Sequence, residues 1–138
     1  MKIVALLLLS LEVIWGPLPA PADIRCHDGD TIIMDLKGLP QVFGRGISLR
    51  LSGIDCPEIR DADPVVRAHA LKARKYLADR IDAAKKVQVL DAKRDKYFRL
   101  NGRLLLDGVD MSKEMIDKGF AKPYDGGTKQ PWKREDIK

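Results

Sequence analysis

Three short clusters of carboxylates and arginines contain the residues best suited to chemistry. They are Asp28-Gly29-Asp30-Thr31, then Arg50 with Asp55-Cys56-Pro57-Glu58, and then Asp95-Lys96-Tyr97-Phe98-Arg99. The acids offer oxygen ligands for a hard divalent cation and one further carboxylate that could act as a base, and arginines bind phosphates through paired N–H groups. Such a set can hydrolyse a phosphodiester, because cationic groups stabilise the transition-state charge while a carboxylate handles the attacking water. One cluster alone would be weak evidence, but three in one basic chain make phosphodiester hydrolysis the leading hypothesis.

Asp30 and Asp55 are the predicted cation ligands, because each closely follows a glycine at the edge of an expected strand. Two carboxylates, one main-chain carbonyl and water form a flexible oxygen shell, which favours Ca²⁺ over Mg²⁺. An isolated Asp-Gly-Asp is more often a turn, so the metal hypothesis depends on the additional acids. Glu58 follows Asp55 after a rigid Cys56-Pro57 step. We expect Glu58 beside the cation, where it could orient or deprotonate a water molecule.

Arg50 and Arg99 are the candidates for binding the scissile phosphate. Arg103 competes with Arg99 for this assignment. Arg99 is favoured because the turn 95–97 presents it on a loop, whereas Arg103 begins an apolar run.

The expected elements suggest a small barrel with two helices packed against it, a mainly β fold with helices (α+β). Alternation of apolar and polar residues predicts strands, and in 47–52 it places Arg50 on the polar face of a rigid strand. An apolar stripe at helical spacing after Asp63-Pro64 predicts a helix, on which we expect His69 to be an ordinary surface histidine. The predicted strands are 31–36, 47–52, 87–90 and 103–106, and the predicted helices are 64–81 and 111–118, the second closed by Gly119.

The two ends of the chain differ from the domain between them, predicted at 23–124. Lys2, the apolar run 3–11 and the small residues Ala20-Pro21-Ala22 are typical of a secretory signal peptide, so we expect 1–22 to be cleaved after Ala22 and the protein to be secreted or periplasmic. The alternative is an uncleaved N-terminal anchor. The charged, glycine-containing tail 125–138 is expected to be largely mobile.

The composition fits a polyanionic partner but does not require one. The net charge of +5 over 138 residues suits nucleic acid, although a soluble basic surface would look the same. Cys26 and Cys56 could form a disulfide in an oxidising compartment, and the sequence leaves this open. A zinc site using these cysteines with His27 and His69 is disfavoured, because the paired cysteine spacing of structural zinc sites is missing.

From about Cys26 to Tyr124 the chain resembles the staphylococcal nuclease (thermonuclease) family. The resemblance lies in the segments 28–31, 50–58 and 95–99 and in Gly119-Phe120-Ala121-Lys122. It implies a five-stranded OB-fold barrel with helices against it. It also implies an exported, calcium-dependent endo- or exonuclease that hydrolyses DNA and RNA with little sequence preference and leaves 3′-phosphate ends. We expect single-stranded substrates to be preferred, a monomer, and no stable membrane association after signal cleavage.

The same resemblance implies a role for each matching residue. Asp30 and Asp55 would bind Ca²⁺ by side chain and Cys56 by its main-chain carbonyl, with Asp28 behind these direct ligands. Glu58 would activate water, and Arg50 and Arg99 would bind phosphate. The nucleotide would be contacted by Lys96, Tyr97 and, more loosely, Tyr124. Three features depart from the family. The first strand would be short after cleavage at Ala22, Cys56 stands where Thr or Ala is usual, and the chain ends soon after Trp132, without a long C-terminal helix.

Two interpretations from other classes compete with the nuclease. A catalytically idle OB-fold could bind single-stranded nucleic acid through a basic groove, but such a binder has no need of clustered acids near phosphate, and few aromatic residues could stack on bases. A calcium-binding structural module would not explain Arg50 and Arg99.

Overall fold

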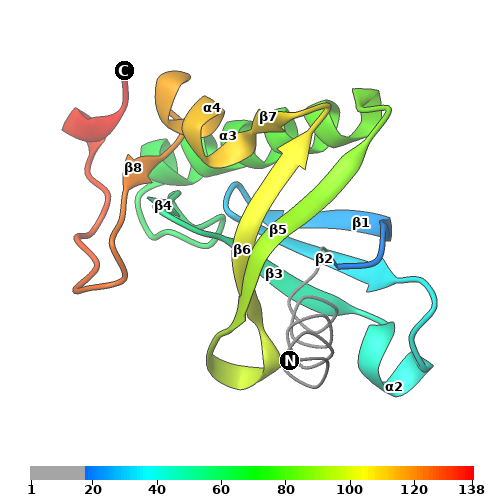
Figure 1. Cartoon of the computed structure of the whole chain (residues 1–138). Coiled ribbons are helices and arrows are strands. Elements are labelled where there is room, and N and C mark those ends of the chain that lie inside the picture. Colours follow the sequence, from blue (N-terminus) through cyan, green and yellow to red (C-terminus); the bar gives the residue numbers. More distant parts are fainter. Residues whose placement is uncertain (1–17) are drawn as a thin grey trace, which may run out of the picture.

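The computed structural model describes residues 18–138, except for the side chain of Tyr97. It consists of a curled sheet with helices packed against it (Figure 1). The main sheet has the strand order β1-β2-β3-β6-β5, with β7 paired to β6, and β4 pairs with β8 in a separate ladder. The elements are β1 (Pro21–Asp28), β2 (Thr31–Leu36), α2 (Gln41–Gly44), β3 (Ile47–Leu51), β4 (Ile54–Asp55), α3 (Pro64–Ala83), β5 (Val87–Arg94), the 3₁₀ turn η1 (Lys96–Phe98), β6 (Leu100–Leu106), β7 (Val109–Asp110), α4 (Met111–Asp117), β8 (Lys122–Pro123) and the 3₁₀ turn η2 (Arg134–Asp136).

The order of the strands gives the sheet its half-barrel shape. All pairs in it are antiparallel except β3 and β6, which run parallel, and the edge strands β1 and β5 approach each other. The predicted OB-type architecture, mainly β with helices, is thereby confirmed. Among residues 18–138, the short α2 is an additional helix that the sequence patterns did not predict.

The predicted strands are all present, with extended boundaries for two of them. Segment 31–36 matches β2, and segment 47–52 matches β3 to within one residue. In β3 Leu49 and Leu51 are fully buried on the core side. The segments 87–90 and 103–106 lie within the longer strands β5 and β6, because polar residues on their outer faces weaken the pattern near the turn that joins them.

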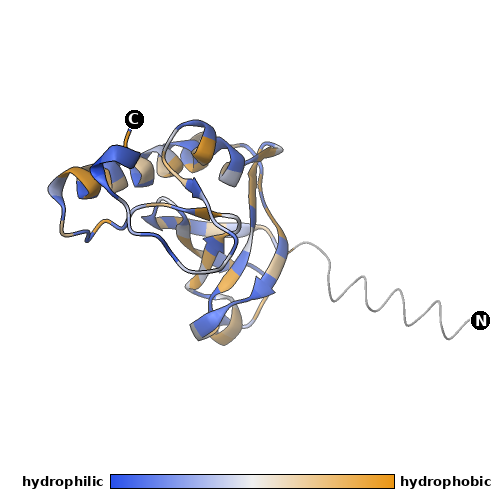
Figure 2. Ribbon diagram, turned by 90° about the vertical axis from the view of Figure 1, so that its left-hand side faces the viewer, coloured by the Kyte–Doolittle hydropathy of each residue, from blue (hydrophilic) through white to orange (hydrophobic). Residues whose placement is uncertain are grey.

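Helix α3 begins and packs as its sequence predicts. The side chain of Asp63 accepts a hydrogen bond from the Val65 N–H at 2.8 Å, which caps the helix start. The predicted apolar stripe is buried, and Ala73, Leu77 and Ile81 pack into the core formed with the sheet; the members of the stripe are Val66, Ala70, Ala73, Leu77 and Ile81. Figure 2 shows the resulting alternation of apolar and polar residues along α3 and the strands. Gly119 follows α4 with φ +76°, the left-handed conformation predicted for it.

The expectation that His69 lies on the surface is wrong. Its ring is buried, its Nε2 lies 3.0 Å from the Gly119 carbonyl oxygen, and it packs against the rings of Phe120 and Trp132. The neighbouring charges on α3 suggested an exposed position, but helical spacing places His69 on the side that faces α4 and the C-terminal segment.

The first strand is longer than expected. β1 has eight residues, and Pro21 and Ala22 pair with Leu36 and Asp35 of β2. The predicted cleavage point after Ala22 therefore falls within β1. Residues 1–17 of the predicted signal peptide lie outside the described residues. From residue 18 onward, no helix has the length and apolar character needed to cross a membrane.

Candidate active site

The turn between β1 and β2 is held tightly against the body of the domain. A Cβ atom at Gly29 would lie 2.8 Å from the Ala73 Cβ and 3.0 Å from the Cys56 Sγ, so only glycine fits this approach. Asp28 accepts a hydrogen bond from the Ile59 N–H at 3.2 Å. The turn thus places its two acids beside the segment that contains Cys56 and Glu58.

Arg50 joins the two predicted cation ligands. Its Nη1 lies 3.2 Å from the Asp30 Oδ1 and its Nη2 lies 3.1 Å from the Asp55 Oδ1. Nη2 also donates to the Ile54 carbonyl oxygen at 3.3 Å. All three charged side chains are at least 90 % buried. The structure therefore brings Asp30 and Asp55, 25 positions apart in the sequence, to one guanidinium group.

Burial destabilises the charged form of the Asp30 carboxylate. Loss of hydration raises the pKa of this carboxyl above its usual value, and this outweighs the opposing effects of Arg50 and of the Cys56 N–H, which donates to Asp30 Oδ2 at 2.7 Å. An additional cation near Asp30 would stabilise its charged form.

Both cysteines are free thiols. Burial raises the pKa of Cys26 to about 11 and that of Cys56 well above its usual value. Both are therefore protonated at neutral pH, whereas the thiolate is the form that binds metals. The main-chain role predicted for the Cys56 carbonyl is unaffected by this and stays a prediction.

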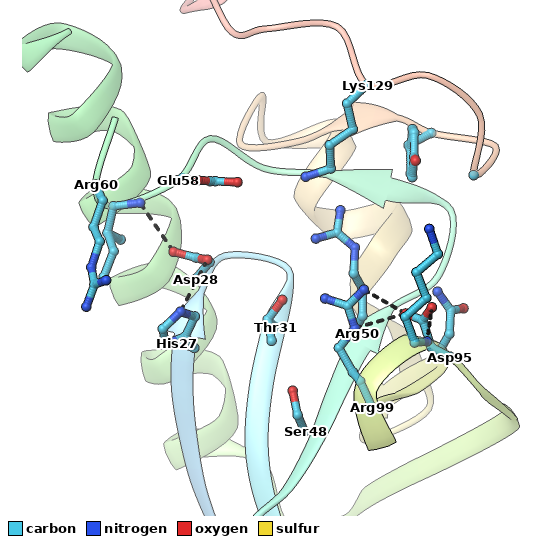
Figure 3. A pocket seen from close by; sticks show the side chains of 15 residues that line it. His27, Asp28, Thr31, Ser48, Arg50, Glu58, Arg60, Asp95, Arg99 and Lys129 are labelled. Carbon is cyan, nitrogen blue, oxygen red and sulfur yellow. Dashed lines mark hydrogen bonds and ion pairs between the residues drawn. The ribbon is translucent and has the colours of Figure 1, made fainter. Parts of the chain in front are cut away.

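A pocket of about 610 Å³ opens above this buried centre (Figure 3). Lysine and arginine outnumber acids in its lining, so the local field favours an anionic ligand. Most of the predicted site residues contribute to the lining: Asp28, Arg50, Glu58, Lys96, Arg99 and Tyr124, together with Arg60 and Lys129. Asp30 and Asp55 are not in this lining; Asp55 and Cys56 instead line a smaller adjoining hollow that shares Glu58 and Lys129 with the pocket.

Glu58 differs from the other acids of the site. It is exposed, it lies at the boundary of the pocket and the adjoining hollow, and Figure 3 draws no contact to it from the other lining residues. Asp30 and Asp55, by contrast, are engaged through both of their oxygens. Glu58 is thus the acid whose oxygens are accessible to water.

The turn between β5 and β6 forms one wall of the pocket and fixes Arg99. Asp95 accepts hydrogen bonds from the Lys96 N–H at 2.7 Å and from the Arg99 Nε at 2.9 Å. The hydrogen bond to the Lys96 N–H is the largest of the effects that lower the pKa of Asp95. Arg103 instead pairs with Asp91 and Asp110 away from the pocket lining. The structure therefore places Arg99, and not Arg103, at the pocket; the side chain of Tyr97 lies outside the described part of the chain.

The C-terminal segment 125–138 folds back over the site. The Lys129 Nζ lies 2.7 Å from the Asp55 Oδ1, and the Trp132 Nε1 donates to the Asp55 Oδ2 at 3.1 Å. The expectation of a mobile tail did not anticipate these contacts. Lys129, Trp132 and the pocket-lining Arg60 are among the site residues that sequence reasoning missed, since no motif marks them.

Further contacts anchor this segment to the domain. Lys122 lies 2.6 Å from Asp136 and 4.5 Å from the centre of the Trp132 ring, and Arg134 lies 2.7 Å from Asp63 at the start of α3. Just before this segment, the Tyr124 N–H donates to the Gly53 carbonyl oxygen at 2.9 Å. The Tyr124 ring centre lies 6.0 Å from the Arg50 guanidinium carbon.

The residues present fit a hard cation with two side-chain ligands. Within residues 18–138, no three His, Cys, Asp or Glu side chains cluster closely enough to hold a metal ion. The predicted calcium shell requires only two such side chains, and Asp30 and Asp55 meet at Arg50. Because burial raises the pKa of Asp30, positive charge nearby would stabilise its ionised form. Asp55 already pairs with the ammonium group of Lys129. The donor atoms are oxygens, the type that Ca²⁺ binds.

Comparison with known proteins identifies the family of the chain. The family described as staphylococcal nuclease homologue matches residues 48–137, which includes Arg50, Asp55, Glu58 and Arg99. A protein of Schizosaccharomyces pombe named "Probable endonuclease C19F8.04c" is 33% identical over 98 residues, which is 64% of this chain and 42% of that protein. The chain thus spans less than half the length of this relative. The family match covers more than half of the chain, and the chain therefore belongs to the staphylococcal nuclease family.

Proposed function

We propose that this protein is a nuclease that hydrolyses phosphodiester bonds in DNA and RNA. The observation that carries the proposal is the combination of an accessible Glu58 carboxylate with Arg50 and Arg99 in one basic pocket. The named relative, called a probable endonuclease, supports the same activity.

The chemistry follows from the positions of these side chains. Arg99, fixed by Asp95, and the exposed Lys96 would hold the phosphate against the pocket wall. Arg50 would direct positive charge from the buried side, where water is largely excluded and electrostatic stabilisation is stronger. Glu58 would orient a water molecule and accept its proton as the water attacks phosphorus and the bond to the leaving oxygen breaks.

We further propose calcium as the cofactor, held by the side chains of Asp30 and Asp55 with the Cys56 carbonyl, and with Asp28 behind them. When bound, such a cation would supply positive charge to the phosphate oxygens in the transition state. The closeness of the Asp30 and Asp55 carboxylates, which both contact Arg50, supports a site for a cation there.

From the sequence we further propose that the protein is exported with cleavage of residues 1–22 and that the enzyme is a monomer. We also propose that it prefers single-stranded substrates and leaves 3′-phosphate products. The basic lining of the pocket supports a polyanionic substrate.

An idle OB-fold that binds single-stranded nucleic acid is the second candidate. It shares the basic pocket, but it leaves the accessible carboxylate of Glu58 without a purpose. A carboxylate near the phosphate weakens binding by repulsion, so its presence favours hydrolysis.

The test is release of acid-soluble nucleotides from denatured DNA by the full chain, with Ca²⁺ and with chelator. Glu58→Gln is expected to reduce turnover by about 10²-fold or more while nucleic-acid binding is largely kept. Glu135→Gln, an exposed glutamate outside the pocket lining, is the matched control. Normal turnover in Glu58→Gln would refute the base assignment, and binding without cleavage under every metal would favour the idle fold.

A further inference from the structure

The turn between β5 and β6 carries an aromatic residue in a conformation that favours glycine. Phe98 has φ +58°. The other non-glycine residues with positive φ in the described part of the chain are all aspartates, Asp23, Asp91 and Asp107. Aspartate tolerates this region through its short polar side chain, whereas for a bulky residue it is an outlier with an energetic cost.

The side chain of Phe98 does not offset this cost by packing. It is 84% exposed, which is more than any other large apolar side chain among the described residues. The ring is nevertheless oriented, because the Arg94 guanidinium carbon lies 5.1 Å from its centre. A cation near an aromatic ring is attracted to its face, and the ring keeps most of its surface in contact with solvent.

The ends of the turn that carries Phe98 are joined by hydrogen bonds. Besides the two hydrogen bonds accepted by the Asp95 side chain, the Asp95 N–H donates to the Arg99 carbonyl oxygen at 2.7 Å and the Arg99 N–H donates to the Lys96 carbonyl oxygen at 3.1 Å. The ring is therefore presented to solvent by a hydrogen-bonded turn.

The place of the turn connects the ring to the pocket. Asp95, Lys96 and Arg99, on either side of Phe98 in the chain, all line the pocket (Figure 3). A strand whose phosphate is held by Arg99 and Lys96 must pass this turn. An exposed ring beside exposed basic side chains is the combination on which single strands stack their bases.

From these observations we propose that Phe98, oriented by Arg94, is a stacking platform for an unpaired base next to the phosphate bound in the pocket. The inference rests on the proposed function, which already includes a preference for single strands, and adds to it the residue that contacts an unpaired base. Inside a duplex both faces of a base are covered by the neighbouring base pairs, so the platform discriminates against duplex. This accounts for an exposed aromatic ring at a position where glycine would suit the backbone better.

Binding to an oligothymidine of about ten nucleotides tests the proposal, measured on the full chain in a Glu58→Gln background to prevent hydrolysis. Phe98→Ala is expected to weaken binding by a factor between about 5 and 150, the range for stacking of one base. Phe43→Ala is the matched control, since Phe43 is also an exposed phenylalanine, 68% exposed on α2, which contributes no residue to the pocket lining, whereas the turn of Phe98 contributes Asp95, Lys96 and Arg99. Phe98→Trp should keep or increase the affinity.

A second ligand separates stacking from other effects of the substitution. The same oligonucleotide backbone with abasic sugars should bind equally tightly to the protein that retains Phe98 and to the Phe98→Ala variant. An equal loss on both ligands, or no loss on either, would overturn the platform, while binding of the protein that retains Phe98 would leave the proposed function intact. If the protein that retains Phe98 binds neither ligand, the proposed function and the inference both fail. Phe98→Gly should fold with a Tm at least as high as that of the unsubstituted protein, and a fall of more than about 5 °C would give the ring a structural role and overturn the inference.

Discussion

Removal of the Lys129 ammonium group is expected to tighten calcium binding. Lys129 Nζ lies 2.7 Å from Asp55 Oδ1, an oxygen that the proposed cation would need. A divalent cation at Asp55 must therefore displace this ammonium or be repelled by it. The substitution Lys129→Gln removes the charge and keeps most of the length of the side chain.

The size of the effect follows from the exposure of the two partners. The Asp55 side chain is 9% exposed, but that of Lys129 is 42% exposed, so solvent screens the pair strongly. A close ion pair with an exposed partner contributes about 1 kcal/mol. That amount corresponds to about a fivefold change in an equilibrium constant, and we expect the calcium Kd of Lys129→Gln to fall by about this factor.

Titration calorimetry with Ca²⁺, without nucleic acid, measures this directly. Lys113→Gln is the matched control, because it removes the same charge from α4, outside the pocket lining. In chelator, Lys129→Gln should be less stable to urea by about 1 kcal/mol, and this difference should vanish or reverse with saturating Ca²⁺. If Lys129→Gln binds Ca²⁺ no more tightly than Lys113→Gln does, Lys129 does not compete with the cation and the reasoning is refuted.

Two other expectations concern the arginines and the pH dependence of stability. Arg99→Ala should lower kcat by about 10²-fold or more with little change in folding, whereas Arg103→Ala should mainly lower Tm; the opposite pattern in paired kinetic and melting measurements would reverse the two assignments. Glu114 accepts a hydrogen bond from Arg80 at 2.6 Å, which is the main cause of a pKa below the usual 4.5. Its charged form therefore stabilises the fold above about pH 4.5, and this contribution is lost as the pH falls through the lowered pKa. Glu114→Gln should be less stable by about 1–2 kcal/mol in urea unfolding at pH 7, and a deficit that does not shrink on acidification would contradict the linkage.

Much of the fold was predictable because the spacing of apolar residues along the sequence indicates which side of a helix or strand is buried. The stripe on α3 and the alternation in β3 each repeat a simple spacing, and the start signal at Asp63-Pro64 and Gly119 mark helix ends by local chemistry. The short α2 lacks such a signal. It has four residues, and Val42 and Phe43 on it are exposed, so no apolar stripe distinguishes it from a loop.

The pairing of the site residues was predictable only in part. The motifs identify Asp30, Asp55, Glu58 and the two arginines, and the structure gathers them around one pocket and its buried floor. Their roles in catalysis stay predictions. No periodicity or local motif links Asp55 to Lys129, which lies 74 positions later in a polar tail. Such a contact depends on how the chain returns after β8, which is a property of the tertiary fold.

The contact between Lys129 and Asp55 changes the net charge of the site. Two buried carboxylates, Asp30 and Asp55, face two cationic groups, Arg50 and Lys129, so their charges cancel within the chain. Of the two cations, Arg50 is buried and bound to both acids, whereas Lys129 is partly exposed and bound to one. Loss of the Arg50 contacts would leave the buried Asp30 without a cationic partner and cost several kcal/mol, about 3–5 by comparison with other buried pairs. If the proposed divalent ion binds, Lys129 is therefore the cation that we expect it to displace. Since Lys129 also lines the pocket, we expect its ammonium group then to be free to meet the phosphate of the substrate.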